Sequence, residues 1–199
     1  MHKVFISYHH ANDQWYKEEL AKFAEQHQIF DDQSVDTGEI DDDLDDETIR
    51  ELIRDDYLKD TSVTILLVGT ETKHRKHVDW EIYSSMRDGK VNKKSGILVI
   101  TLPSTGCTSY HAAHEGEKKL LYPTTTQWTT IKERSEFERR YPCLPNRIID
   151  NLLASKVKIS VTNWDKINVG TLTFLVNAAY DDRRSCEYDL SRKMRRANS

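Results

Sequence analysis

A glutamate and a histidine lie one helical turn apart in the stretch RKHVDWEIYSSM, residues 75–86. His77 and Glu81 are spaced i and i+4, so they share one face if this stretch is a helix. On a face that looks into a pocket, a carboxylate can stabilise positive charge on a substrate. A glutamate in the first turn of a helix can also simply complement the helix dipole. The two interpretations remain open at the level of this motif.

Further candidates follow the first apolar run, KVFISY at 3–8. Phe5 lies inside the run, Ser7 and Tyr8 end it, and His9 comes next. In open α/β sheets, ligands bind in the crevice beyond the carboxyl ends of the strands. If the run is such a strand, these four side chains line or approach the crevice. Phe5 and Tyr8 are equally well explained as plain core residues.

Two loops add candidates to the same crevice. Asp36 begins a polar, glycine-containing loop, and Thr70 follows the run SVTILLVGT at 62–70. Asp36 either contacts a substrate or caps a turn. Thr70, like Thr72, either approaches a phosphate or caps the next helix, and capping is favoured because threonine is a good N-cap residue.

The sequence lacks the motifs that mark several other kinds of functional site. YHHAND, after the first run, has no glycine, so neither a phosphate-binding loop nor a dinucleotide fingerprint is present. HAAHE at 111–115 is not in the HExxH order of a zinc helix, and we expect no metal site. There is no GxSxG nucleophile elbow. A phospho-relay domain is also disfavoured, because the first and third runs end without its acidic residues.

Apolar runs alternate with stretches of helical periodicity. This alternation predicts an α/β fold, a flavodoxin-like, doubly wound parallel sheet flanked by helices. We expect strands at 3–8, 28–30, 62–70, 96–103 and 156–162, and helices at 12–27, 46–58, 77–89, 145–155 and 165–185. Asn12 or Asp13 is expected to cap the first helix.

The same pattern predicts the domain organisation. Residues 1–185 form one domain, 104–145 form an irregular insertion, and 186–199 form a basic, flexible tail. The function of the insertion stays open between a lid, a self-inhibitory segment and an oligomer contact.

Composition narrows the class of protein. The chain has 199 residues and a net charge of −4, which gives no nucleic-acid signature. No apolar run approaches the length needed to cross a membrane, and no signal peptide is visible. The three cysteines are widely spaced and odd in number, which indicates free thiols in a reducing cytoplasm.

Charge is unevenly distributed along the chain. Residues 31–60 contain fourteen Asp or Glu against three Lys or Arg, whereas the last residues are rich in arginine. Solvated surface is the simpler explanation. The alternative is that acidic and basic faces of neighbouring copies meet in a homo-oligomer, which could form on activation.

Three stretches taken together resemble a TIR-type domain. They are KVFISYHHAND, LKDTSVTILLVGTETKHRKHVDWEI and GILVITLP. More narrowly, they are similar to the bacterial TIR-like branch of the Thoeris antiphage system. VFISY and LVGTET match the pattern of that branch, and HVDWEI matches it except at its first position. The resemblance covers about residues 1–102 and is silent on 104–145.

The resemblance implies a site. Enzymatic TIR domains cleave NAD with one glutamate on the helix after the middle strand, and Glu81 matches that position. An aromatic residue often lies one turn earlier, where this chain has His77, and Trp80 belongs to the motif of the branch. NAD is then the substrate, nicotinamide is released, and no further cofactor is implied. In this branch the product is a cyclic ADP-ribose isomer, a diffusible signal that activates a separate effector.

The physical chemistry of that reaction is coherent. The nicotinamide of NAD is already cationic and leaves without acid catalysis, so the cost lies in the oxocarbenium-like charge on the ribose. An ionised carboxylate beside the sugar stabilises that charge. A place near a helix N-terminus is expected to keep Glu81 ionised.

Two other functions remain open. One is a non-catalytic TIR adaptor that acts by assembling with its own copies or with a partner. The more distant one is a nucleotide-binding or nucleoside-transferase enzyme of flavodoxin-like fold.

Overall fold

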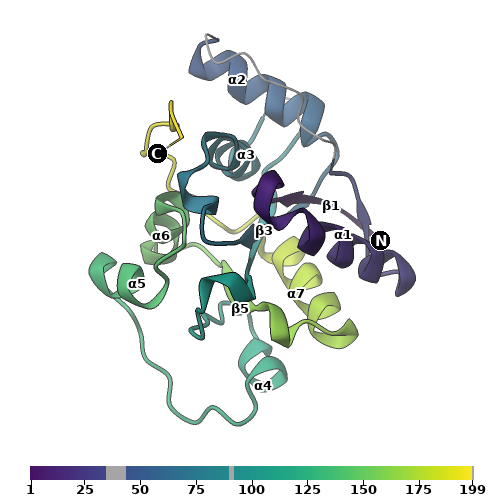
Figure 1. The fold of residues 1–199 in the computed structure, drawn as a ribbon, viewed down its shortest axis with the longest axis vertical. Helices are drawn as coiled ribbons and strands as arrows, with labels where there is room; N and C mark the ends of the chain where they lie inside the picture. The colour runs from purple at the N-terminus through teal and green to yellow at the C-terminus, as the bar shows by residue number, and fades with distance from the viewer. Residues whose placement is uncertain (35–43, 90–91, 199) are drawn as a thin grey trace.

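The computed structural model describes residues 1–34, 44–89 and 92–198, and its centre is a parallel sheet (Figure 1). The strand order is β2-β1-β3-β4-β5, and every neighbouring pair is parallel. The strands are β1 (His2–Ser7), β2 (Phe30–Asp32), β3 (Val63–Val68), β4 (Gly96–Thr101) and β5 (Ser160–Asn163). This order confirms the predicted doubly wound fold. Its crevice lies where the order reverses, between β1 and β3.

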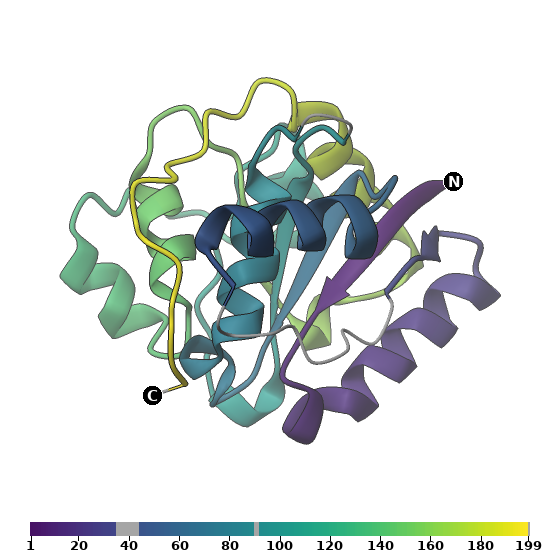
Figure 2. The same ribbon diagram turned by 90° about the horizontal axis from the view of Figure 1, so that it is seen from above.

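Helices cover both faces of the sheet (Figures 1 and 2). One face carries α1 (His10–Gln26), α4 (Glu117–Leu121) and α7 (Val169–Asp182). The other carries α2 (Asp46–Leu52), α3 (Lys76–Met86), α5 (Arg134–Arg140) and α6 (Asn146–Leu153). Among the described residues, no helix is both long enough and apolar enough to cross a bilayer.

The central strands have the composition that a doubly covered sheet requires. VTILLV of β3 and GILVIT of β4 are buried along their whole length, because helices lie on both of their faces. Gly96 lets α7 approach the sheet, since a Cβ there would lie 2.0 Å from the carbonyl oxygen of Ala179. The packing of α7 on β4 therefore depends on residue 96 being a glycine, which has no side chain.

Some boundaries differ from the sequence prediction. The helix expected at 46–58 is α2 followed by a π-helical turn, Ile53–Tyr57. The insertion at 104–145 contains α4 and α5, so it is not irregular throughout. Periodicity does not distinguish a π turn from α-helix, and helices as short as α4 and α5 leave too few repeats to detect.

The predicted cap of the first helix is wrong. The helix α1 begins at His10, and its N-cap residue, His9, makes no side-chain cap hydrogen bond. Asp13 lies in the first turn and is buried, where its carboxylate accepts a 3.5 Å hydrogen bond from the Thr72 hydroxyl. It points inward because the β3–α3 connection packs against this turn: a Cβ on Gly69 would lie 2.4 Å from Asp13 Oδ2.

The basic C-terminal segment packs on the domain. Figure 2 shows it running beside α6 and toward α3, and Met194 is buried with Phe5 and Trp80. Arg147 of α6 donates to the carbonyl oxygens of Arg192 and Lys193 at 2.9 and 3.2 Å. The predicted boundary at residue 185 and the predicted flexibility stay predictions. Met194 nevertheless packs in a core cluster of the domain, and its neighbours at 192, 193 and 195 form hydrogen bonds with the domain.

Candidate active site

A buried serine–glutamate pair lies at the switch point of the sheet. Ser7 ends β1, and Glu81 lies on α3, which follows β3. The Ser7 hydroxyl donates a 2.7 Å hydrogen bond to Glu81 Oε2. Their exposed fractions are 1% and 3%. The structure thus brings together two of the residues that the sequence singled out, 74 positions apart.

The expectation that the helix N-terminus keeps Glu81 ionised is wrong. The helix begins at Lys76, so Glu81 lies in its second turn, and Asp79 is the acidic residue of the first turn. Burial raises the pKa of Glu81 to about 7, and the hydrogen bond from Ser7 opposes that rise. Burial wins because the macrodipole acts mainly on the first turn, whereas desolvation penalises any buried charge.

Successive side chains of a strand point to opposite faces of the sheet, so the candidate residues of β1 lie on both faces. Phe5 and Ser7 point toward α3, whereas Tyr8 packs in the cluster beneath α1 and α7. Tyr8 donates to Gln14 Oε1 at 2.5 Å and stacks on His10. Tyr8 therefore lies on the opposite side of the sheet from Glu81, as the core interpretation expects.

His9 lies just beyond β1 and is largely buried. Its Nδ1 atom has no hydrogen-bond partner. Burial, followed by the charge of Arg75, lowers the pKa of His9, which favours the neutral form of the ring. A buried, neutral imidazole with an unused nitrogen beside the β3–α3 connection can accept or donate one more hydrogen bond.

The aromatic neighbours of Glu81 serve packing. Phe5 and Trp80 belong to one core cluster, and Trp80 is 1% exposed. The indole Nε1 of Trp80 donates to the carbonyl oxygen of Arg195 at 2.7 Å. His77 is partly exposed and meets Trp80 edge-on, with ring centroids 5.2 Å apart. His77 is therefore the more accessible of the two.

The predicted capping role of the threonines is wrong. The N-cap residue of α3 is Arg75, which makes no side-chain cap hydrogen bond. Thr72 instead accepts a 2.9 Å hydrogen bond from the backbone N–H of Gly69, which closes the turn after β3. Thr70 is exposed beside this turn. A 3₁₀ turn, Thr72–His74, separates the threonines from α3. Asp36 lies outside the described residues.

The insertion histidines have partners of their own. His114 Nδ1 and Asp182 Oδ2 are 2.7 Å apart, and the backbone of His111 pairs with Val161 of β5. Within residues 1–34, 44–89 and 92–198, no three His, Cys, Asp or Glu side chains gather closely enough to hold a metal ion. The three cysteines are unpaired.

Sequence reasoning missed the ion pair that anchors α3. The guanidinium of Arg147 is fully buried and donates to both carboxylate oxygens of Asp79, at 2.8 and 2.9 Å. Asp79 Oδ2 also accepts from the backbone N–H of Arg195. Residues 79, 147 and 195 are far apart in sequence, so no local pattern pointed to this network.

Together, the strand order and the carboxylate of α3 at the β1–β3 switch point define a TIR-like α/β domain. The family model described as "Thoeris protein ThsB, TIR-like domain" matches residues 5–106, just over half of the 199 residues. The chain belongs to this family. The match includes Ser7 and Glu81 and ends at the start of the insertion. No curated protein matches the chain.

Proposed function

We propose that this chain is an NAD-consuming enzyme of the NAD glycohydrolase and ADP-ribosyl cyclase type. It releases nicotinamide and makes a cyclic ADP-ribose isomer, an antiphage signal that activates a separate effector in the cytoplasm. The observation that carries the proposal is the Glu81 carboxyl group, held by Ser7 at the switch point of a Thoeris-family TIR domain.

The proposed reaction balances without a further reactant. The glycosidic C–N bond breaks, and its electron pair goes to the departing nicotinamide, which becomes neutral. The ribose retains an oxocarbenium-like charge, which the ionised Glu81 stabilises. A hydroxyl group elsewhere on the same ADP-ribose then attacks the anomeric carbon and gives its proton to Glu81. If water attacks instead, the product is linear ADP-ribose.

The raised pKa of Glu81 suits both parts of this reaction. A carboxyl group with a pKa of about 7 is partly ionised at neutral pH and is basic enough to accept the hydroxyl proton. A cationic nicotinamide nearby favours the charged form of Glu81. Substrate binding would therefore promote the ionisation that catalysis needs.

Burial of the pair fits a resting enzyme. Ser7 and Glu81 are almost inaccessible, so the groups packed over them have to move before the carboxylate can touch a ribose. An enzyme that consumes NAD harms its own cell when unregulated. A closed site that opens on infection is consistent with that constraint.

Mass spectrometry of infected cells tests the proposal. Cells expressing the wild-type chain or Glu81→Gln are compared for a new species with the mass of cyclic ADP-ribose. We expect the species with wild type only, since loss of the carboxylate costs on the order of 10²-fold or more in rate. Ser84→Ala, on the same helix, is the matched control and should retain the product.

A non-catalytic adaptor is the second candidate. It is favoured by the completeness of the Ser7–Glu81 contact, because a buried, hydrogen-bonded carboxyl group can be purely structural. If Glu81→Gln protects cells as well as wild type and neither yields the nucleotide, the enzyme proposal fails and the adaptor is preferred.

A further inference from the structure

The C-terminal segment caps the helix that carries Glu81. Arg75, the N-cap residue of α3, makes no side-chain cap hydrogen bond. The backbone N–H of Lys76, at the start of the helix, instead donates to Asn198 Oδ1 at 2.9 Å. The first N–H groups of a helix have no partner within it. Asn198, 122 positions from Lys76, therefore supplies the contact that a local N-cap residue usually supplies.

Two further hydrogen bonds hold the same end of α3. The backbone N–H of Arg195 donates to Asp79 Oδ2 at 2.8 Å, and the carbonyl oxygen of Arg195 accepts from Trp80 Nε1 at 2.7 Å. Trp80 immediately precedes Glu81. The C-terminal segment therefore contacts three of the residues that precede Glu81 in the helix.

The other end of the segment is anchored on α6. The side chain of Asn151 is fully buried and bonds to both backbone groups of Asp189. Its Oδ1 atom accepts from the N–H at 2.8 Å, and its Nδ2 atom donates to the carbonyl oxygen at 3.1 Å. Met194 is buried between the two ends. Residues 189–198, the C-terminal strap, therefore cross from α6 to α3, and Figure 2 shows them in yellow.

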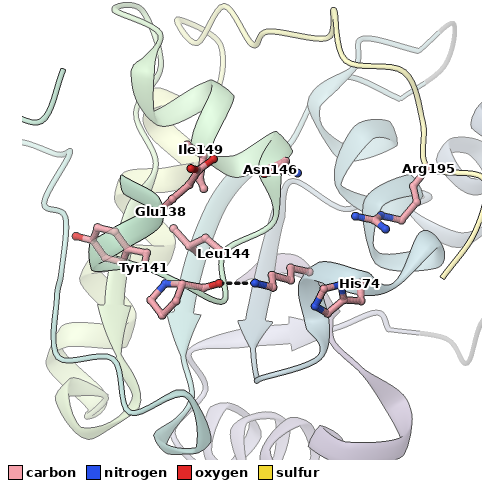
Figure 3. Close-up of a pocket in the computed structure, with 9 residues that line it drawn as sticks. His74, Glu138, Tyr141, Leu144, Asn146, Ile149 and Arg195 are labelled. Carbon is pink, nitrogen blue, oxygen red and sulfur yellow. Dashed lines mark hydrogen bonds between the residues drawn. The ribbon is translucent and has the colours of Figure 1, made fainter. Parts of the chain in front are cut away.

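The strap has the features of a segment that opens locally. Residues 186–198 include no helix or strand, so the backbone of the strap depends on its contacts with the domain. Within residues 189–198, Met194 is the one buried side chain, and Figure 3 shows Arg195 beside an open hollow of about 440 Å³. A segment with few buried apolar contacts opens at a lower free energy than the whole fold. The strap can therefore detach while the sheet stays folded.

The strap and Glu81 lie on opposite sides of α3. An α-helix turns by about 100° per residue, so Glu81 points about 140° away from Lys76 around the helix axis. Asp79 and Trp80 lie within about 60° of Lys76. Glu81 faces β1, where it accepts the hydrogen bond from Ser7 and is 3% exposed. A ribose needs space between α3 and β1 to reach this carboxylate, and a helix that moves away from β1 moves toward the strap. The three hydrogen bonds between the strap and α3 oppose that movement.

We propose that the C-terminal strap is an autoinhibitory element, which holds α3 against β1 and keeps Glu81 closed until the strap detaches. The inference rests on the proposed function, because it assigns a regulation to the same carboxylate. Detachment leaves the outer side of α3 uncovered, so the helix can move away from β1 and the substrate can reach Glu81. Loosening of the strap should therefore increase the rate of NAD cleavage.

Nicotinamide release by the purified full-length protein tests the inhibition. Asn198→Ala removes the contact with Lys76 and should increase the rate of NAD cleavage about fivefold, because loss of a cap contact weakens the closed state. Met194→Ser removes the buried anchor and should increase the rate by about tenfold or more. The double variant of Met194→Ser and Glu81→Gln should release no nicotinamide, since the carboxylate is lost.

Asn168→Ala is the matched control. Asn168 caps α7 by accepting from the backbone N–H of Thr171, so this variant loses the same kind of contact on the other face of the sheet. It should leave the rate of NAD cleavage unchanged. Hydrogen exchange followed by mass spectrometry gives a second readout. Asn198→Ala and Met194→Ser should accelerate exchange in residues 76–86 and not in α7, whereas the control should do the reverse.

The two readouts separate failure of the strap from failure of the proposed function. If exchange in α3 is unchanged in both strap variants, the strap does not hold the helix and the inference is overturned. It is also overturned if exchange accelerates but neither variant cleaves NAD faster than wild type, and a wild type that cleaves NAD then leaves the proposed function intact. If exchange accelerates and none of the proteins cleaves NAD, the inhibition and the proposed function fail together.

Discussion

At the scale of single residues, the Glu81 carboxyl group has the most strongly shifted pKa in the candidate active site. A carboxyl group in water has a pKa near 4.5, and burial raises that of Glu81 to about 7. Ser7 provides its hydrogen bond, and Ser84 of the same helix has a buried hydroxyl oxygen without a partner. The buried serine at the end of β1 thus contacts the carboxylate, whereas the hydroxyl of the buried serine within α3 has no hydrogen-bond partner.

The pair of serines gives a direct test of that contact. Ser7→Ala should raise the pKa of Glu81 by about one to two pH units, because a hydrogen bond to a charged group is worth about 1.5–3 kcal/mol and favours the ionised form. Carbon-13 NMR of labelled glutamate measures it, with the Glu81 resonance assigned by its loss in Glu81→Gln. Ser84→Ala should leave the titration unchanged. Equal titrations in all three proteins would show that the Ser7 bond has no influence.

The raised pKa also predicts a pH dependence of stability. Folded Glu81 holds its proton up to about pH 7, whereas the unfolded chain releases it near pH 4.5. The favourable contribution is complete below pH 4.5 and is lost as pH rises to about 7, for a total of about 3 kcal/mol. Urea unfolding at pH 4.5 and pH 8 measures this change, and Glu81→Gln should abolish it. An identical pH dependence in both proteins would contradict the prediction.

At the scale of secondary-structure elements, the buried ion pair between α3 and α6 fixes the helix that carries Glu81. Arg147 bonds both oxygens of Asp79 and two carbonyl oxygens of the C-terminal segment. Three segments from distant parts of the chain therefore meet at one guanidinium. Its removal leaves a carboxylate that is 9% exposed without its charge partner.

Replacement of Arg147 should strongly destabilise the fold. Arg147→Met is expected to lower the free energy of unfolding by about 3–5 kcal/mol, because it leaves an uncompensated buried charge. Glu187→Gln is the comparison, since it breaks an ion pair with Lys156 whose two side chains are about two-thirds exposed. That change should cost at most about 1 kcal/mol. Urea titration of both variants measures the difference, and equal losses would show that Arg147 is not a structural anchor.

The strands and helices show which features of the fold could be predicted from the sequence. The five strands and the fold class followed from runs such as VTILLV, because a doubly covered parallel sheet needs continuous apolar strands. Glu81 was found from a local motif. The Asp79–Arg147 pair and the ionisation of Glu81 were not predictable, because both depend on burial by segments distant in sequence. The capping predictions failed because Asp13 and Thr72 contact each other instead of their own helices.

At the scale of the whole molecule, the C-terminal segment joins α3 and α6 across one face of the domain. Met194 is 6% exposed and packs with Phe5 and Trp80, between basic residues that are cleavage sites for trypsin. Cleavage there requires the segment to open, so its rate reports how firmly the segment is held.

Loosening of this segment should accelerate its proteolysis. Burial of a methionine side chain contributes about 1.5–3 kcal/mol, so Met194→Ser should increase the rate of tryptic cleavage within residues 192–196 by about 10- to 100-fold. Mass spectrometry of timed digests identifies the cleavage positions. Leu120→Ser, at a residue that is 47% exposed, is the control and should change little. If wild type and Met194→Ser are cleaved at the same rate, the segment is not held by this contact.

The hydrogen bond between Trp80 and Arg195 has a consequence for synthesis of the protein. The two residues are 115 positions apart, and Arg147 is made about midway between them. At about 5–20 residues per second, the ribosome needs on the order of ten seconds to pass from one to the other. During that interval the outer face of α3 has emerged without its cover. Each nascent chain therefore spends a period exposed to chaperones and to aggregation, and the helix with Glu81 acquires its native packing among the last steps of folding.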